Sequence, residues 1–203
     1  MDFKKHLETS WNLTLKYIAP LIFMTLLMLI VSFFTLGILF PVTMAGYIYS
    51  ILLMIREGRE PKIQDIFSHM RLFFPLLGFT LLVVIVVLIG FMLLLLPGIF
   101  FMLAVSFCCI YMIPIMVDQN LGLVDSIKKS YALAFHGEVV DHIVIVLLFI
   151  GITAIGNSIF IGTLLTQPFA TIFLLSVYQE KLTALDSSEK PKIESTKAAM
   201  TEK

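Results

Sequence analysis

Charged residues are absent from three long stretches of this sequence. No Asp, Glu, Lys or Arg occurs in residues 17–55, 72–117 or 142–179, and these stretches contain 39, 46 and 38 residues. Charged residues make up only 14% of the 203-residue chain, against about 25% in a typical soluble domain. Because one membrane-spanning helix needs only about 20 apolar residues, each stretch is long enough for two spans joined by a turn. The pattern predicts six transmembrane helices.

The sequence also contains few features that indicate nucleic-acid binding or enzyme activity. Lys and Arg number 14 and Asp and Glu number 14, so no net positive charge favours nucleic acid. The two cysteines, Cys108 and Cys109, are adjacent. Neighbouring residues of a helix point in different directions, so we expect packing roles without a disulfide. With no nucleophile elbow, dinucleotide fingerprint or phosphate loop, we expect neither enzyme activity nor a cofactor.

Hydrophobic residues, by contrast, make up 59% of the chain, and the mean hydropathy is +1.00. This excess cannot all be buried in the core of a 22.9 kDa protein. We therefore predict an all-α integral membrane protein with one polytopic membrane domain, residues 1–182. Its six helices would form three helical hairpins in repeat-like units, residues 1–56, 62–117 and 123–181.

Each unit begins with an amphipathic stretch, in which apolar residues recur every three or four positions, as on one face of a helix. The three apolar stripes are Phe3, Leu7, Trp11, Leu15 and Ile18; Ile63, Ile66, Phe67 and Met70; and Leu123, Ile127, Tyr131 and Phe135. Proline suits the first turn of a helix, so we expect the second spanning helix of each unit to begin near Pro41, Pro97 and Pro168. In the third unit, residues 156–158 are an alternative turn.

The basic residues lie only between the hydrophobic units and at the ends of the chain. Lys and Arg that flank membrane spans stay in the cytoplasm, so both termini are predicted to be cytoplasmic. Residues 183–203 are rich in Ser, Thr, Glu and Lys. We expect them to form a disordered cytoplasmic tail, because they carry too few apolar side chains to offset the entropy of ordering.

Several residues are candidates for a functional site. Basic residues beside the amphipathic stripes are predicted to contact lipid headgroups; they are Lys4, Lys5, Arg71, Lys128 and Lys129. Asn157 and Gln167 could line a polar pathway. Glu138 and His142 are four residues apart and could share one face of a helix, which offers a metal site as an alternative to a simple interfacial cluster. That cluster also contains His136 and Asp141.

Two further features have local interpretations. Asn120 is positioned to cap the helix that follows it. Small residues recur every four positions, and on one continuous helix they would allow close helix packing within the protein or in a homo-oligomer; they are Ala154, Ser158, Gly162, Thr166 and Ala170.

Two junctions in the sequence resemble those of a known family. Residues 54–62, which lead into Asp65-Ile66-Phe67, resemble the junction before an amphipathic helix in small bacterial multi-span proteins. Residues 96–100 together with 117–130 look like their second signature. The family includes the membrane domain attached to some glycerophosphoryl diester phosphodiesterases, and related stand-alone proteins. The resemblance covers about residues 1–182 and implies a bacterial inner-membrane location. The catalytic phosphodiesterase domain has no counterpart here.

These observations lead to two hypotheses about function. The first is a non-enzymatic membrane protein that organises the membrane, or recruits an unidentified membrane partner, through amphipathic helices in contact with anionic lipid. The alternative is a transporter or channel for a small or amphipathic solute. A third hypothesis, an intramembrane enzyme built on the cluster of residues 136–142, has less support.

Overall fold

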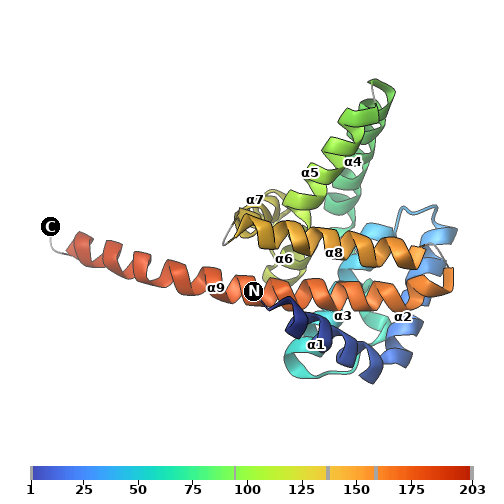
Figure 1. The fold of residues 1–203 in the computed structure, drawn as a ribbon, viewed down its shortest axis with the longest axis horizontal. Coiled ribbons are helices and arrows are strands. Elements are labelled where there is room, and N and C mark those ends of the chain that lie inside the picture. The colour runs from blue at the N-terminus through green and yellow to red at the C-terminus, as the bar shows by residue number, and fades with distance from the viewer. Residues whose placement is uncertain (1, 94, 136–137, 158–159, 202–203) are drawn as a thin grey trace.

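The structure, a computed structural model, describes residues 2–93, 95–135, 138–157 and 160–201 (Figure 1). Helix is the only regular secondary structure in these residues, which confirms the all-α prediction. The elements in chain order are α1 (Phe3–Lys16), α2 (Ile18–Phe34), α3 (Phe40–Glu57), the 3₁₀ turns η1 (Ile63–Phe67) and η2 (Met70–Leu72), α4 (Phe73–Leu93), α5 (Leu95–Cys109), α6 (Met112–Gln119), α7 (Leu123–Phe135), α8 (Val139–Asn157) and α9 (Phe160–Thr201).

Two helices, α3 and α9, form the centre of the molecule. Helix α3 packs against α2, α4, α6, α9 and η1, while α9 packs against α1, α2, α3 and α8. The core between them contains fully buried aromatic and branched side chains, among them Tyr47, Ile51, Ile115 and Phe173. Segments far apart in the sequence therefore share one hydrophobic core, as expected of a single domain.

Three helical segments of the described chain are long and apolar enough to cross a membrane: Ile63–Met92, Leu96–Gln119 and Val139–Gly156. A fourth crossing is obtained if α1 and α2 are counted as one span, although they meet at an angle of 88°. The predicted six spans are not confirmed. Helix α2 contains only 17 residues, and α3 includes buried polar residues and ends in charge.

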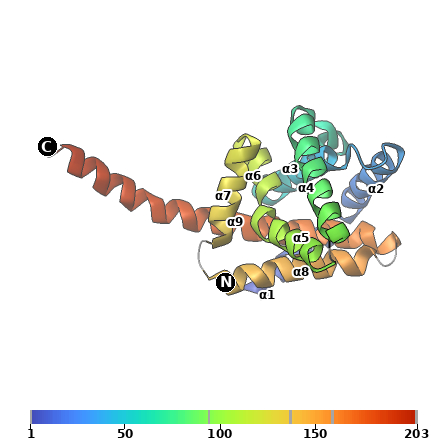
Figure 2. The ribbon, with the colours of Figure 1, turned by 90° about the horizontal axis from the view of Figure 1, so that it is seen from above.

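The pair α4–α5 stands away from the rest of the molecule at a steep angle to α8 and α9 (Figures 1 and 2). Its side chains are apolar and largely exposed, and only 11% of the most apolar window of Ile63–Met92 is buried. The two helices approach closely at Gly90, where an added Cβ would lie 2.8 Å from the Cα of Gly98. An exposed apolar surface of this extent needs a lipid environment.

The amphipathic stretches of the first and third units form α-helices, as predicted, but only part of each apolar stripe packs on the protein. In α1, Trp11 is 57% exposed, whereas Ser10 and Thr14 are buried against the body. In α7, Tyr131 is 53% exposed, whereas Ser130 is buried. Small polar side chains let helices approach closely, so both helices direct large apolar side chains outward.

The second amphipathic stretch differs from the prediction, because it forms the two 3₁₀ turns η1 and η2 in place of an α-helix. The Ser68 hydroxyl donates to the Asp65 carbonyl at 2.6 Å. Such local bonds compete with the i→i−4 ladder of an α-helix. The backbone of this segment also lies directly on α3, since a Cβ added to Gly46 would overlap the carbonyl oxygens of Asp65 and Ile66.

The segment Leu96–Gln119 is broken at Ile110 and Tyr111, between α5 and α6. Side chains replace the helical bonds lost there. His142 Nε2 lies 2.8 Å from the Phe107 carbonyl oxygen, and Ser130 Oγ donates to the Cys108 carbonyl at 2.7 Å. The Tyr111 amide donates to Ser130 Oγ at 3.2 Å. A break with satisfied backbone groups is compatible with membrane depth.

The third unit reverses at the alternative turn. Helix α8 ends at Asn157 and α9 begins at Phe160, so Pro168 lies inside α9 and the prediction of a helix start there was wrong. Pro41 and Pro97 do lie in the first turns of α3 and α5. The backbone of α9 continues as helix to Thr201 and projects away from the body (Figure 1), whereas composition predicts a disordered tail.

Candidate functional site

A network of polar side chains joins the C-terminal ends of α3 and α6 to the middle of α7 and of α9. The Arg56 guanidinium binds both carboxylate oxygens of Asp118, with Nη2 at 2.8 Å from Oδ2. The Tyr178 hydroxyl donates to the same Oδ2 at 2.9 Å. The hydrogen bond to Asp118 raises the pKa of Arg56 above its ordinary value, so the guanidinium stays charged in this bidentate contact.

The network continues to α7. Gln119 Nε2 lies 3.4 Å from the Tyr178 hydroxyl, and Lys129 Nζ donates to Gln119 Oε1 at 2.8 Å. Lys128 is exposed, whereas Lys129 is half-buried. The two lysines were predicted to share one role, and their surroundings differ: Lys129 is held by Gln119, whereas the side chain of Lys128 is exposed.

A second cluster anchors the loop between α3 and η1. Arg59 forms an ion pair with Asp65, and Ser50 Oγ donates to the same carboxylate at 2.8 Å. The amide of Lys62 donates to Ser50 Oγ at 3.2 Å. Ser50 is fully buried in α3, so this cluster fastens the loop and η1 to the central helix.

The prediction that Asn120 caps the helix that follows it was wrong. Asn120 ends α6 in the left-handed conformation, with a φ of 53°, and so caps the helix before it and not the helix after it. Asn adopts this conformation more readily than most residues. Its side-chain oxygen accepts a hydrogen bond from Arg71, which brings that predicted lipid-contact residue to the end of α6.

A hollow of about 370 Å³ lies beside Arg56. Tyr49, His69, Arg56, Asp118 and Asn120 are among the residues that line it. The rings of Tyr49 and His69 are 4.7 Å apart, and His69 Nδ1 lies 2.8 Å from the Ser68 hydroxyl. We call this the polar hollow. It combines the guanidinium of Arg56, other hydrogen-bond donors and an aromatic wall.

The other predicted headgroup residues lie on α1. Lys4 and Lys5 are exposed on its outer surface, and Lys4 is 3.7 Å from Glu8. A pair this exposed contributes little to stability. Lys4, Lys5 and Lys128 therefore accompany the exposed apolar faces of α1 and α7.

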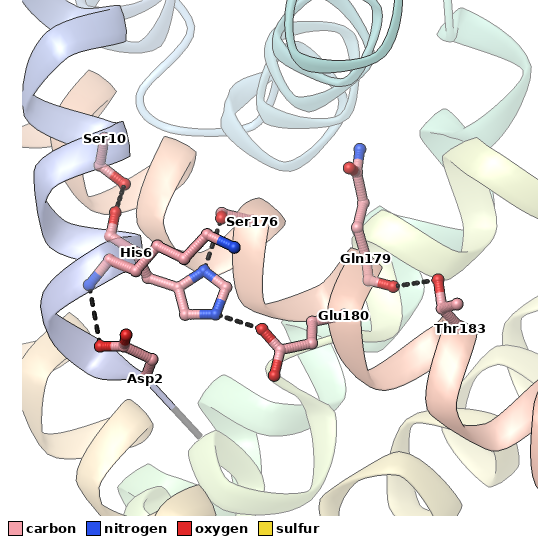
Figure 3. Close-up of polar contacts among 8 residues, drawn as sticks. Asp2, His6, Ser10, Ser176, Gln179, Glu180 and Thr183 are labelled. Carbon is pink, nitrogen blue, oxygen red and sulfur yellow. Dashed lines mark hydrogen bonds and ion pairs between the residues drawn. The ribbon is translucent and has the colours of Figure 1, made fainter.

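Figure 3 shows a constellation that sequence reasoning missed. His6 on α1 lies between two residues of α9, with Nδ1 2.6 Å from Ser176 Oγ and Nε2 2.6 Å from Glu180 Oε2. The residues are 170 and 174 positions apart, and nothing in the local sequence indicates that they meet. The side chain of His6 is 7% exposed and that of Glu180 is 51% exposed.

These residue types also form catalytic triads, but the surroundings of Ser176 favour a structural role. Ser176 lies within α9, where backbone amides donate to carbonyls one turn earlier. Those amides cannot also form an oxyanion hole, the donor pair that acyl transfer requires. The constellation instead fixes α1 on α9.

The alternative metal site is not assembled among the described residues, which contain no group of three or more His, Cys, Asp and Glu side chains able to hold an ion. His136 lies outside the described residues. Glu138 is exposed, whereas His142 is fully buried and its Nε2 is engaged at Phe107. His142 therefore serves the break between α5 and α6.

The residues predicted to form a polar pathway and a stripe of small residues are arranged differently in the structure. Gln167 is half-buried, with Nε2 3.7 Å from Met44 Sδ and 3.5 Å from Thr171 Oγ1, and the side chain of Asn157 lies outside the described part. The stripe is divided between α8 and α9, so it is not one continuous face. Gly156 packs against Thr166 where the two helices meet.

The fold and the exposed apolar helices define a helical membrane protein. Comparison of the chain with family models, with curated proteins and with solved structures finds no match. The resemblance to the membrane domain of glycerophosphoryl diester phosphodiesterases stays a prediction.

Proposed function

We propose that this protein is a non-enzymatic integral membrane protein that contacts anionic lipid through α1 and α7 and thereby organises the membrane or recruits a partner to it. The observation that carries the proposal is the orientation of these two helices. Both bury small polar residues, such as Ser10 and Ser130, and expose large apolar ones, such as Trp11 and Tyr131. Amphipathic helices of this kind lie in the headgroup layer, with their lysines attracted to anionic lipid.

We further propose a bacterial inner-membrane location, with three helical hairpins that cross the membrane six times and both termini in the cytoplasm. The support is the position of charge. The polar network joins the C-terminal ends of α3 and α6 to Tyr178 of α9, while the turn at residues 35–39 carries no charge. Basic residues that flank spans stay in the cytoplasm, so the polar network and the outer surfaces of α1 and α7 belong to the cytoplasmic side.

The lipid contact is tested by reversing the exposed lysines. Near an anionic surface each such charge contributes about 1 kcal/mol, so Lys128→Glu is expected to weaken anionic lipid contact about tenfold or more. Phosphatidylglycerol and cardiolipin retained through purification are counted by lipid mass spectrometry. The matched control is Lys129→Gln, because Lys129 is already held by Gln119.

Equal retention of both lipids by Lys128→Glu and the unmodified protein would contradict the proposal. The alternative function, transport of a small or amphipathic solute, is addressed by flux assays on liposomes that contain the purified protein. Solute-specific flux that persists after Lys128→Glu would favour the transporter.

A further inference from the structure

A second hollow lies beside the polar hollow, and its lining is almost entirely apolar. Its volume is about 280 Å³, close to the lower end of ligand pockets, about 300 Å³. Phe79 of α4, Cys109 of α5 and Phe149 of α8 are among the residues that line it. We call it the apolar hollow. It is bounded by the most lipid-exposed helices of the described chain.

The two hollows follow one another along the same helices. On α3, Ile48 lines the apolar hollow and Leu52 lines the polar one. On α6, Ile113 lines the apolar hollow and Val117 lines the polar one. Residues four apart share a helix face and are separated by about 6 Å along the axis. The hollows are therefore consecutive sections along the α3–α6 side of the protein, one polar and one apolar.

The charges at the polar hollow favour an anion. Arg56 and Asp118 line it as an ion pair, and Arg71 adds a second positive charge through its hydrogen bond to Asn120, which also lines the hollow. A guanidinium has five N–H donors, and Arg56 uses two of them on Asp118. The side-chain oxygen of Asn120 accepts a hydrogen bond from Arg71. The side-chain NH₂ group of Asn120 is therefore a further donor. Arginine matches phosphate geometry particularly well.

We propose that this pair of hollows binds one anionic glycerophospholipid. Its phosphate lies in the polar hollow beside Arg56, Arg71 and Asn120, and an acyl chain occupies the apolar hollow beside Cys109. The occupant follows from the order of the two sections, since an anionic head joined to an apolar chain is the amphipathic ligand that a bilayer supplies. This site is separate from the outer surfaces of α1 and α7 and does not depend on their lipid contacts.

The two adjacent cysteines provide a matched test. Both are free thiols of intermediate exposure, but Cys109 lines the apolar hollow and Cys108 does not. Two variants of the full chain, Cys108→Ala and Cys109→Ala, each keep one thiol. Each is delipidated in detergent and alkylated with N-ethylmaleimide while phosphatidylglycerol is titrated in. We expect phosphatidylglycerol to slow alkylation of Cys109 several-fold and to leave the rate at Cys108 unchanged.

The headgroup contact is tested in the Cys108→Ala background. Arg71→Gln removes a charged donor from an exposed position, so the phosphatidylglycerol concentration that half-protects Cys109 should rise about tenfold. Lys62→Gln, an equal loss of charge at an exposed side chain of the loop before η1, should leave it unchanged. Inorganic phosphate alone should give no protection, and diacylglycerol should protect only at higher concentration than phosphatidylglycerol.

Equal protection of both thiols, or no protection of Cys109, would overturn the proposal. Diacylglycerol that protects as well as phosphatidylglycerol would overturn the assignment of the polar hollow to phosphate. The result is distinguishable from the test of α1 and α7, since Lys128→Glu should lower total lipid retention without changing protection of Cys109. All variants are first compared by size-exclusion chromatography, so that loss of the fold is not read as loss of binding.

Discussion

Helices α3 and α4 follow one another in the chain, and both come from long uncharged stretches, yet they occupy opposite environments. Eleven of the 18 residues of α3 are buried. In α4, Leu76 is the one buried residue among those whose burial the structure describes. The difference lies in the small and polar residues of α3, such as Thr43, Gly46 and Ser50, which allow other backbones to approach it. In a membrane protein, apolar content alone does not identify the core.

The largest expected effect is at the closest approach to α3. Gly46→Val would place a side chain against the carbonyl oxygens of Asp65 and Ile66. Because backbone cannot move aside as a flexible side chain can, we expect a loss of more than about 3 kcal/mol and little folded protein. Gly78→Val on α4, where nothing lies within 4 Å of an added Cβ, should fold normally. The yield of monodisperse protein on size-exclusion chromatography measures both, and equal yields would show that the contact between α3 and η1 can relax.

A smaller effect is expected from truncating apolar side chains. Ile51 on α3 is fully buried, whereas Leu82 on α4 is 57% exposed. Ile51→Ala leaves a cavity and should cost about 2–5 kcal/mol. Leu82→Ala should cost much less, since lipid can fill the space. Thermal denaturation of the two variants in detergent gives the comparison, and a larger loss for Leu82→Ala would reverse our assignment of the core.

The smallest effect concerns one hydroxyl. Ser50→Ala removes the donor to Asp65 and the acceptor for the Lys62 amide. Asp65 keeps its ion pair with Arg59, so we expect a loss of about 1–3 kcal/mol. Thr80→Val on the half-buried side of α4 is the control. Protease sensitivity of the loop at residues 58–62 should increase in Ser50→Ala alone, and an unchanged cleavage rate would indicate that Arg59 anchors the loop without Ser50.

Much of the helical content was predictable, because it depends on periodicity and on long apolar stretches. The amphipathic helices α1 and α7 were found from apolar residues such as Trp11 and Tyr131. Their orientation was not, because the periodicity identifies an apolar face without showing whether that face meets protein or lipid. The interruption at Ile110 was also missed, since the side chains that stabilise it, Ser130 and His142, come from later helices.

The candidate site was predicted only in part. Lys4, Lys5 and Lys128 are exposed, and their contact with lipid headgroups stays a prediction. The link between Lys129 and Gln119 joins residues ten positions apart on two helices, and no sequence pattern indicates that their side chains meet. The polar hollow depends on Arg56, which binds Asp118, 62 positions away in the sequence. Such pairings are set by tertiary packing and are invisible to local spacing.

The break between α5 and α6 also bears on the thickness of the surrounding bilayer. Helix α5 has 15 residues and is about 22 Å long, while its partner α4 has 21 residues and is about 31 Å long. The hydrocarbon core of a typical bilayer is about 30 Å thick. One side of this hairpin therefore matches the membrane by itself, whereas the other reaches that length only as the whole segment Leu96–Gln119, with α6 included. The break at Ile110 then falls inside the thickness of the bilayer, where water cannot replace a lost backbone hydrogen bond, so two short helices cross as one span only because Ser130 and His142 bind the carbonyls at the break.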